Sequence, residues 1–161
     1  MTNYGAGLHA RHRSNPSSTV AYSDAALEKD LQRVGEAWET LEATRRRTAI
    51  YPFLTAVFEL VAWWAAEGMA SGRAQRAIRK TMMASLPGID PFAAIILVAA
   101  YPQRLDRRAV SRWSRVLRYA LAYKPRSERL ERFVRRKGGL NKCASLYARR
   151  LGRRAKTHEE I

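Results

Sequence analysis

The sequence has few of the residues that metal binding, redox chemistry or nucleophilic catalysis requires. Cys143 is the single cysteine, so no intramolecular disulfide can form, and a reducing, cytoplasmic setting is favoured. The three histidines, His9, His12 and His158, lie near the ends of the chain, and no Cys/His set has metal-ligand spacing. Neither a P-loop nor a G-x-G-x-x-G motif occurs. We therefore expect a protein that is not an enzyme and that needs no cofactor or metal.

Alternating apolar and polar residues, the pattern of a half-buried strand, are also missing over any useful length. The first twenty residues lack the apolar centre of a signal peptide, so we expect a disordered polar arm over 1–22. We divide the remainder into a helical core region over 23–101, a basic helical segment over 102–156 and a tail over 157–161. The sequence predicts an all-α fold, a compact bundle of about six helices that ends in a basic tri-helical segment.

Acidic residues are scarce in one part of the chain. The 161 residues include 30 Lys and Arg against 14 Asp and Glu, a net charge of +16. Residues 102–156 hold nineteen basic and three acidic residues, so the whole excess lies there, whereas 24–42 has a net charge of −4. Repulsion among so many cations opposes compaction, which indicates an anionic partner. Nucleic acid is the first candidate, and an acidic protein, for which this chain would be an adaptor or inhibitor, or an anionic membrane surface are the alternatives.

Ser23 and Asp24 predict the start of the first helix, because serine caps helices and aspartate favours the positive end of the helix dipole. The apolar residues that follow are spaced 4-3-4-3 and form a seam. They are Leu27, Leu31, Val34, Trp38 and Leu41. The seam predicts either a helix face packed on the core or a surface that joins a second copy of the chain or a protein partner.

Residues 52–69 are apolar on most helical faces, which predicts a central helix. The segment approaches the ~20 residues that a bilayer requires. Glu59 lies in its middle, however, and a carboxylate there costs about 3 kcal/mol on insertion. We therefore expect a core helix, with Glu59 paired to an arginine of another helix, rather than a transmembrane segment.

Two further breaks divide the core region. Ser71 and Gly72 predict the end of the central helix and the start of a short basic one. Asp90 followed by Pro91 predicts an N-cap and first helical position, after which a buried helix runs to Tyr101.

The next helix is predicted from Asp106 to about Tyr123, with apolar residues on one face. An arginine stripe occupies the opposite face: Arg108, Arg112, Arg115 and Arg118. Helix faces that only meet solvent usually interleave glutamates, which form favourable i,i+4 pairs. This stripe has none, so we favour a polyanion-binding surface over an ordinary solvated face. Tyr119 and Tyr123 lie on or near the stripe and are candidates for stacking on bases.

Gly138 and Gly139 predict a left-handed helix end and a tight turn. A short helix capped by Ser127 should precede them over 127–137, and a last helix should follow over 140–153. The inward face of the last helix is Leu140, Cys143, Ala144, Tyr147, Ala148 and Leu151. Three such helices have the outline of a helix–turn–helix DNA-binding module, whose last helix enters the major groove. An αα-hairpin without a groove-reading role has the same outline.

The candidate phosphate-binding residues share two properties: they are basic, and they lie on the outward faces of these last helices. They are Arg108, Arg112, Arg115, Arg118, Arg135, Arg136, Lys142, Arg149 and Arg153. We expect the nearby carboxylates Glu128 and Glu131 to pair with Arg132 and Arg135. DNA is preferred over RNA because of the helix–turn–helix outline, and whether the cations read a sequence or hold a backbone stays open.

Overall fold

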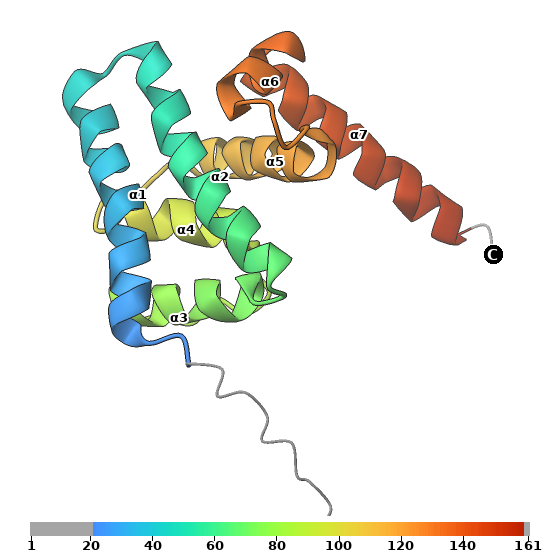
Figure 1. Ribbon diagram of the computed structural model, residues 1–161. Helices are drawn as coiled ribbons and strands as arrows, with labels where there is room; N and C mark the ends of the chain where they lie inside the picture. The colour runs from blue at the N-terminus through green and yellow to red at the C-terminus, as the bar shows by residue number, and fades with distance from the viewer. Residues whose placement is uncertain (1–20, 160–161) are drawn as a thin grey trace, which may run out of the picture.

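The computed structural model describes residues 21–159, with side chains as far as Leu151, and over this range it contains helices and no strand (Figure 1). A 3₁₀ turn, η1 (Arg47–Ala49), connects the first two of seven α-helices. The helices are α1 (Asp24–Thr44), α2 (Ile50–Ala66), α3 (Ala70–Met82), α4 (Pro91–Ala100), α5 (Arg107–Tyr123), α6 (Leu130–Arg136) and α7 (Leu140–Glu159). The predicted all-α bundle is confirmed, with seven helices rather than about six. Most of the expected arm and part of the expected tail lie outside the described residues.

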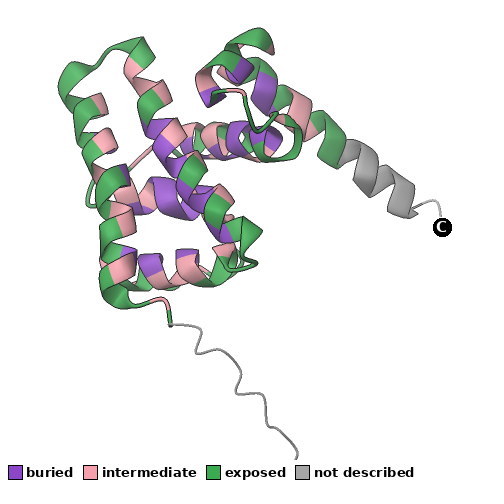
Figure 2. Cartoon of the chain, in the orientation of Figure 1, coloured by how far each residue is buried: buried purple, intermediate pink, exposed green. Residues whose placement is uncertain are grey.

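The helices form one connected core, in which α2 and α4 are central (Figures 1 and 2). In Figure 1, α1 lies to the left of them and α3 beneath them, and α5 packs against α4 and α2 at the upper right. The short helix α6 and the long helix α7 then pack on α5. The largest fully buried side chains come from both parts, among them Trp64 and Phe53 of α2, Phe92 of α4, Leu117 of α5 and Phe133 of α6. The basic tri-helical segment is therefore an integral part of the fold.

Three predicted helix starts are confirmed by side-chain caps. The Ser23 hydroxyl accepts the backbone N–H of Ala26 at 3.1 Å. The Asp90 carboxylate accepts that of Ala93 at 3.3 Å, and Asp106 caps α5 in the same way. Each cap satisfies a backbone donor that the first turn of a helix leaves without a partner.

Two predicted boundaries are wrong. The break between α2 and α3 lies at Gly68, whose φ of +72° ends α2 in a Schellman motif, so Ser71 and Gly72 fall inside α3. Ser127 does not cap α6, which begins only at Leu130. Instead, the Lys124 ammonium donates to the carbonyls of Pro125 and Glu128 and holds the preceding residues as a turn.

The apolar seam of α1 is packed inside its own chain. Leu27, Val34 and Trp38 are buried in the core, and Leu31 and Leu41 pack against it. The Trp38 ring meets Phe53 of α2 edge to face, with the ring centroids 5.2 Å apart. Of the two predicted roles for the seam, packing on the core is the one the structure contains.

The segment Arg47–Ala66 is long and apolar enough to cross a membrane, a criterion that central core helices also meet. Phe53, Leu54 and Trp64 of this segment are fully buried by the other helices. The expected partner of Glu59 is also present, because Arg33 of α1 forms an ion pair with its carboxylate at 2.8 Å. These contacts hold one face of α2 in the core, while Trp63 of the same helix is 45% exposed.

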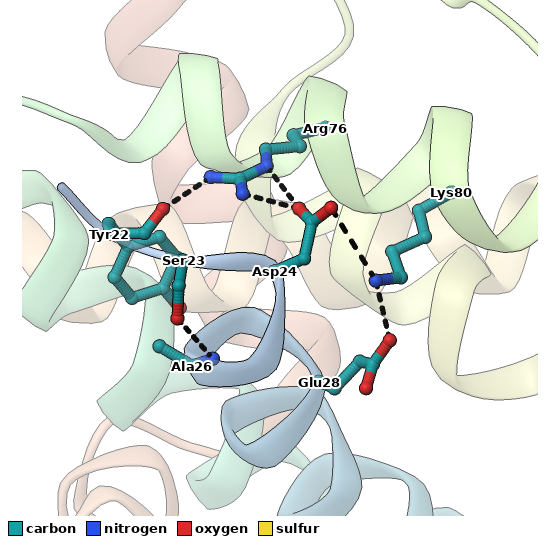
Figure 3. A network of polar contacts seen from close by, with 7 residues as sticks. All are labelled: Tyr22, Ser23, Asp24, Ala26, Glu28, Arg76 and Lys80. Atoms are coloured by element: carbon teal, nitrogen blue, oxygen red, sulfur yellow. Dashed lines mark hydrogen bonds and ion pairs between the residues drawn. The ribbon is translucent and has the colours of Figure 1, made fainter.

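Acidic side chains at the start of α1 neutralise the cations of α3 (Figure 3). The Arg76 guanidinium lies between the Asp24 carboxylate, at 2.8 Å from Nε, and the Tyr22 carbonyl, at 2.7 Å from a terminal nitrogen. The Lys80 ammonium contacts Asp24 and, at 2.5 Å, Glu28. These contacts lower the pKa of Asp24, chiefly through its hydrogen bond with Arg76. Arg76 and Lys80 of α3 therefore have acidic partners within the chain.

Arg45 ends α1 in the left-handed conformation, with φ of +47°. Because a side chain in this conformation costs about 1 kcal/mol relative to glycine, Arg45→Gly should raise the free energy of unfolding by about 0.5–1 kcal/mol. Arg46→Gly is the matched control: it removes the same charge at φ of −81°, and glycine there should lower stability through backbone entropy. Urea denaturation measures both, and equal effects from the two substitutions would contradict the argument.

Candidate nucleic-acid interface

The turn between α6 and α7 is built on its two glycines. Gly138 and Gly139 have φ of +98° and +92°, which side chains rarely adopt. The N–H of Gly139 donates to the carbonyl of Val134 at 2.9 Å, and that of Gly138 to Arg135 at 3.1 Å, which completes a Schellman motif. A Cβ atom on Gly138 would also come within 3.2 Å of the Lys142 side chain. The predicted turn is confirmed, and it sets α7 against α5.

Helix α7 is held by its first two turns. Cys143 is 0% exposed and Ala144 8% exposed, and Tyr147 is half-buried. Burial raises the pKa of the Cys143 thiol, in keeping with the predicted core residue. Leu151, predicted on the same inward face, is 49% exposed, because α7 continues beyond the end of α5 (Figure 1). The predicted inward face is therefore correct for the first turns and wrong at Leu151.

A groove of about 570 Å³ lies between α5 and α7, and we call it the α5–α7 groove. No acidic residue is among the residues that line it. They are Arg107, Arg108, Ser111, Arg112 and Arg115 of α5, and Asn141, Ala144, Ser145 and Ala148 of α7. The α7 residues here are uncharged, so the cations that line the groove all come from α5. The structure thus joins three of the predicted arginines to one face of α7.

The predicted cations of α7 border this groove. Lys142 lies three residues before Ser145 and Arg149 four residues after it, so both are beside a groove-lining position on the helix surface. Both are exposed. Arg153 belongs to α7, but its side chain lies outside the described residues.

Two of the predicted phosphate-binding arginines form ion pairs with carboxylates outside the α5–α7 groove. Arg118 is half-buried and forms an ion pair with Asp90, the N-cap of α4, away from the α5–α7 groove. Arg136 donates to both oxygens of Glu128, at 3.0 and 2.7 Å. This bidentate bond lowers the pKa of Glu128 and raises that of Arg136. The expected pair between Glu128 and Arg132 is therefore wrong, because Glu128 precedes α6 and cannot form an i,i+4 pair within it.

The remaining predictions concern Arg135 and the two tyrosines. Arg135 pairs with Glu131 at 2.8 Å, as expected. Tyr119 is only 6% exposed, because Phe133 of α6 packs on it, with the ring centroids 5.8 Å apart. The ring of Tyr123, also on α5, lies 4.8 Å away. Its prediction as a stacking residue is wrong. Tyr123 is 39% exposed, with the Arg150 guanidinium 4.1 Å from its ring centroid.

A second, larger cleft was not predicted. It has a volume of about 840 Å³ and lies between the α1–α2 connection and the turn of Gly138 and Gly139, and we call it the glycine-turn cleft. Its basic lining residues are Arg45, Arg46, Arg47, Arg112 and Arg135. Three consecutive arginines were the available signal, but the sequence does not reveal that they face a turn ninety residues later.

Most cations of the two hollows lack a described ion pair, and Arg135 of the glycine-turn cleft, which pairs with Glu131, is the exception. Within the residues that the structure describes, seven basic side chains form ion pairs with carboxylates: Arg33, Arg73, Arg76, Lys80, Arg118, Arg135 and Arg136. Cations without such a pair occur over much of the described surface, Arg79, Arg126 and Arg129 among them, and they include those that line or border the α5–α7 groove and those of the α1–α2 connection. Those of the groove and the connection are Arg107, Arg108, Arg112, Arg115, Lys142, Arg149, Arg45, Arg46 and Arg47.

No group of three or more His, Cys, Asp or Glu side chains in the described part of the chain is placed to hold a metal ion. Comparison of the sequence and structure with protein-family models, curated proteins and solved structures finds no match. The chemistry of the two hollows is therefore the basis for a functional proposal.

Proposed function

We propose that this protein is a non-enzymatic nucleic-acid-binding protein that holds phosphates in the α5–α7 groove. The observation that carries the proposal is a continuous wall of four arginines with no carboxylate among the lining residues. Guanidinium groups form paired, charge-assisted hydrogen bonds with phosphate oxygens. A polyanion in the groove would offset the repulsion among these cations, which no described ion pair relieves.

The arrangement of charge favours nucleic acid over the other anionic partners. An acidic protein partner would be favoured by scattered cations and by an unpaired acidic α1. Four arginines share the groove, and Asp24 and Glu28 pair with α3. By contrast, the acidic residues of α1 that are exposed without a described ion pair are Glu36, Glu39 and Glu42. An anionic membrane would require an apolar face of α2, but most of its large side chains are buried in the core, although Trp63 is 45% exposed. DNA is preferred over RNA on the sequence outline alone, three helices with a glycine turn before the last, which is typical of helix–turn–helix modules.

The salt dependence of binding tests this proposal. Each phosphate contact on duplex DNA contributes about −0.9 to the slope of log K against log salt. Six cations line or border the groove: Arg107, Arg108, Arg112, Arg115, Lys142 and Arg149. Contacts from all six predict a slope of about −5 and a loss of affinity of roughly 10³-fold between 50 and 200 mM salt. Fluorescence anisotropy with a labelled duplex measures it, and absent binding at 50 mM, or a slope near zero, would refute the proposal.

A further inference from the structure

We propose that the glycine-turn cleft binds an unpaired stretch of nucleic-acid strand that extends from a duplex held in the α5–α7 groove. This inference rests on the proposed function and adds to it a substrate class, a duplex with a single-stranded tail. It also assigns a role to Arg45, Arg46 and Arg47, which lie outside the basic C-terminal segment.

The three arginines are presented by an ordered connection. The N–H of Arg45 donates to the carbonyl of Leu41, and that of Ala49 to the carbonyl of Arg46, both at 3.0 Å. All three side chains are exposed, and Glu42 is the single acidic residue among those that line the cleft. Across the cleft lie Arg112 and Arg135. Cations from three separate parts of the chain therefore line one hollow.

Aromatic side chains lie between these cations. Tyr51 and Trp113 line the cleft and are half-buried, so part of each ring is accessible. The Arg135 guanidinium is 5.2 Å from the centroid of the Tyr51 ring. Cations that follow a backbone, combined with aromatic faces on which bases stack, are the composition of single-strand binding sites. A site for phosphate alone would need no aromatic wall.

The size of the cleft suits an unpaired strand. Its volume of about 840 Å³ lies within the range of roughly 300–1,000 Å³ that small-molecule pockets occupy. One or a few unpaired nucleotides fit such a space. A duplex, whose major groove alone is about 12 Å wide, lies across the mouth of either hollow with its phosphates against the lining cations, whereas an unpaired strand can enter the cleft.

The cleft and the groove are continuous. Arg112 and Asn141 line both of them. A strand in the α5–α7 groove can therefore pass over Arg112 into the cleft without leaving the basic surface. This shared wall is why we assign the two hollows to one ligand rather than to two.

The test compares a blunt duplex with the same duplex carrying a short single-stranded tail, at one salt concentration. The wild-type protein should bind the tailed duplex about tenfold more tightly, since base stacking and phosphate contacts add to binding. The triple variant Arg45→Ala/Arg46→Ala/Arg47→Ala should bind both duplexes with the blunt-duplex affinity of the wild type. The matched control is Arg79→Ala/Arg126→Ala/Arg129→Ala, which removes three exposed arginines outside both hollows and should keep the preference for the tail.

The outcomes separate this inference from the proposed function. Equal wild-type affinity for the two duplexes, or a triple variant that weakens both equally, overturns the inference while the proposed function stands. Absence of binding to either duplex overturns the proposed function itself. Circular dichroism confirms that each variant is folded. If Arg45→Ala disturbs the end of α1, the double variant Arg46→Ala/Arg47→Ala makes the same comparison, and a retained tail preference there also overturns the inference.

Discussion

Replacing Arg108, Arg112 and Arg115 together with alanine is expected to weaken binding to a duplex by about 10²-fold near 100 mM salt. Each of these side chains is exposed, lines the α5–α7 groove and lacks a described ion pair. Removing three phosphate contacts should also reduce the salt slope from about −5 to between −2 and −3. Thermal or urea unfolding should be nearly unchanged, since surface substitutions of this kind usually alter stability by less than about 0.5 kcal/mol.

Arg118→Ala is the control within the same sequence stripe. Arg118 pairs with Asp90 and lies outside the groove, so its removal should leave the affinity and the salt slope close to those of the wild type. Because the pair is partly exposed, its loss should lower stability only modestly. A triple variant that binds like the wild type, or an Arg118→Ala variant that loses affinity as strongly, would contradict the assignment of the groove.

Among the proposed substitutions, Phe133→Ala is expected to lower the free energy of unfolding most, by about 3–5 kcal/mol. Phe133 is 0% exposed, and its ring lies 5.8 Å from Tyr119, where α6 covers α5. Because small domains are stable by only about 5–15 kcal/mol, the change removes much of the total. Urea denaturation measures it, and Phe133→Leu, which preserves most of the volume, should cost less than about 1.5 kcal/mol. A fall in the free energy of unfolding of less than about 1 kcal/mol for Phe133→Ala would contradict the conclusion that the packing of α6 on α5 stabilises the fold.

The helical fold was predictable because its signals are local. Ser23, Asp90 and Asp106 each cap the helix that follows within three residues, and Gly138 and Gly139 form the turn that their lack of side chains permits. The split of the early part of α7 into buried and exposed faces likewise follows from helical spacing alone. Where neighbouring residues decide the structure, the sequence is sufficient.

The availability of each cation was not predictable because it depends on distant residues. Arg76 meets Asp24 across 52 positions, and Arg33 meets Glu59 across 26. Arg118 shares a helix stripe with Arg115, yet only Arg118 reaches the carboxylate that caps α4. The burial of Tyr119 was not predictable for the same reason, since its position on α5 does not reveal that α6 covers it.

The pairing of α1 with α3 has a consequence for how the protein responds to ionic strength. Attractive pairs hold the N-terminal helices together, so dissolved ions weaken that part of the fold slightly. In α5 and α7 the uncompensated charges repel one another, so the same ions relieve them. Salt should therefore stabilise the free C-terminal helices while it dissociates their ligand. The polyanion and the dissolved anions therefore compete to neutralise the same cations of α5 and α7.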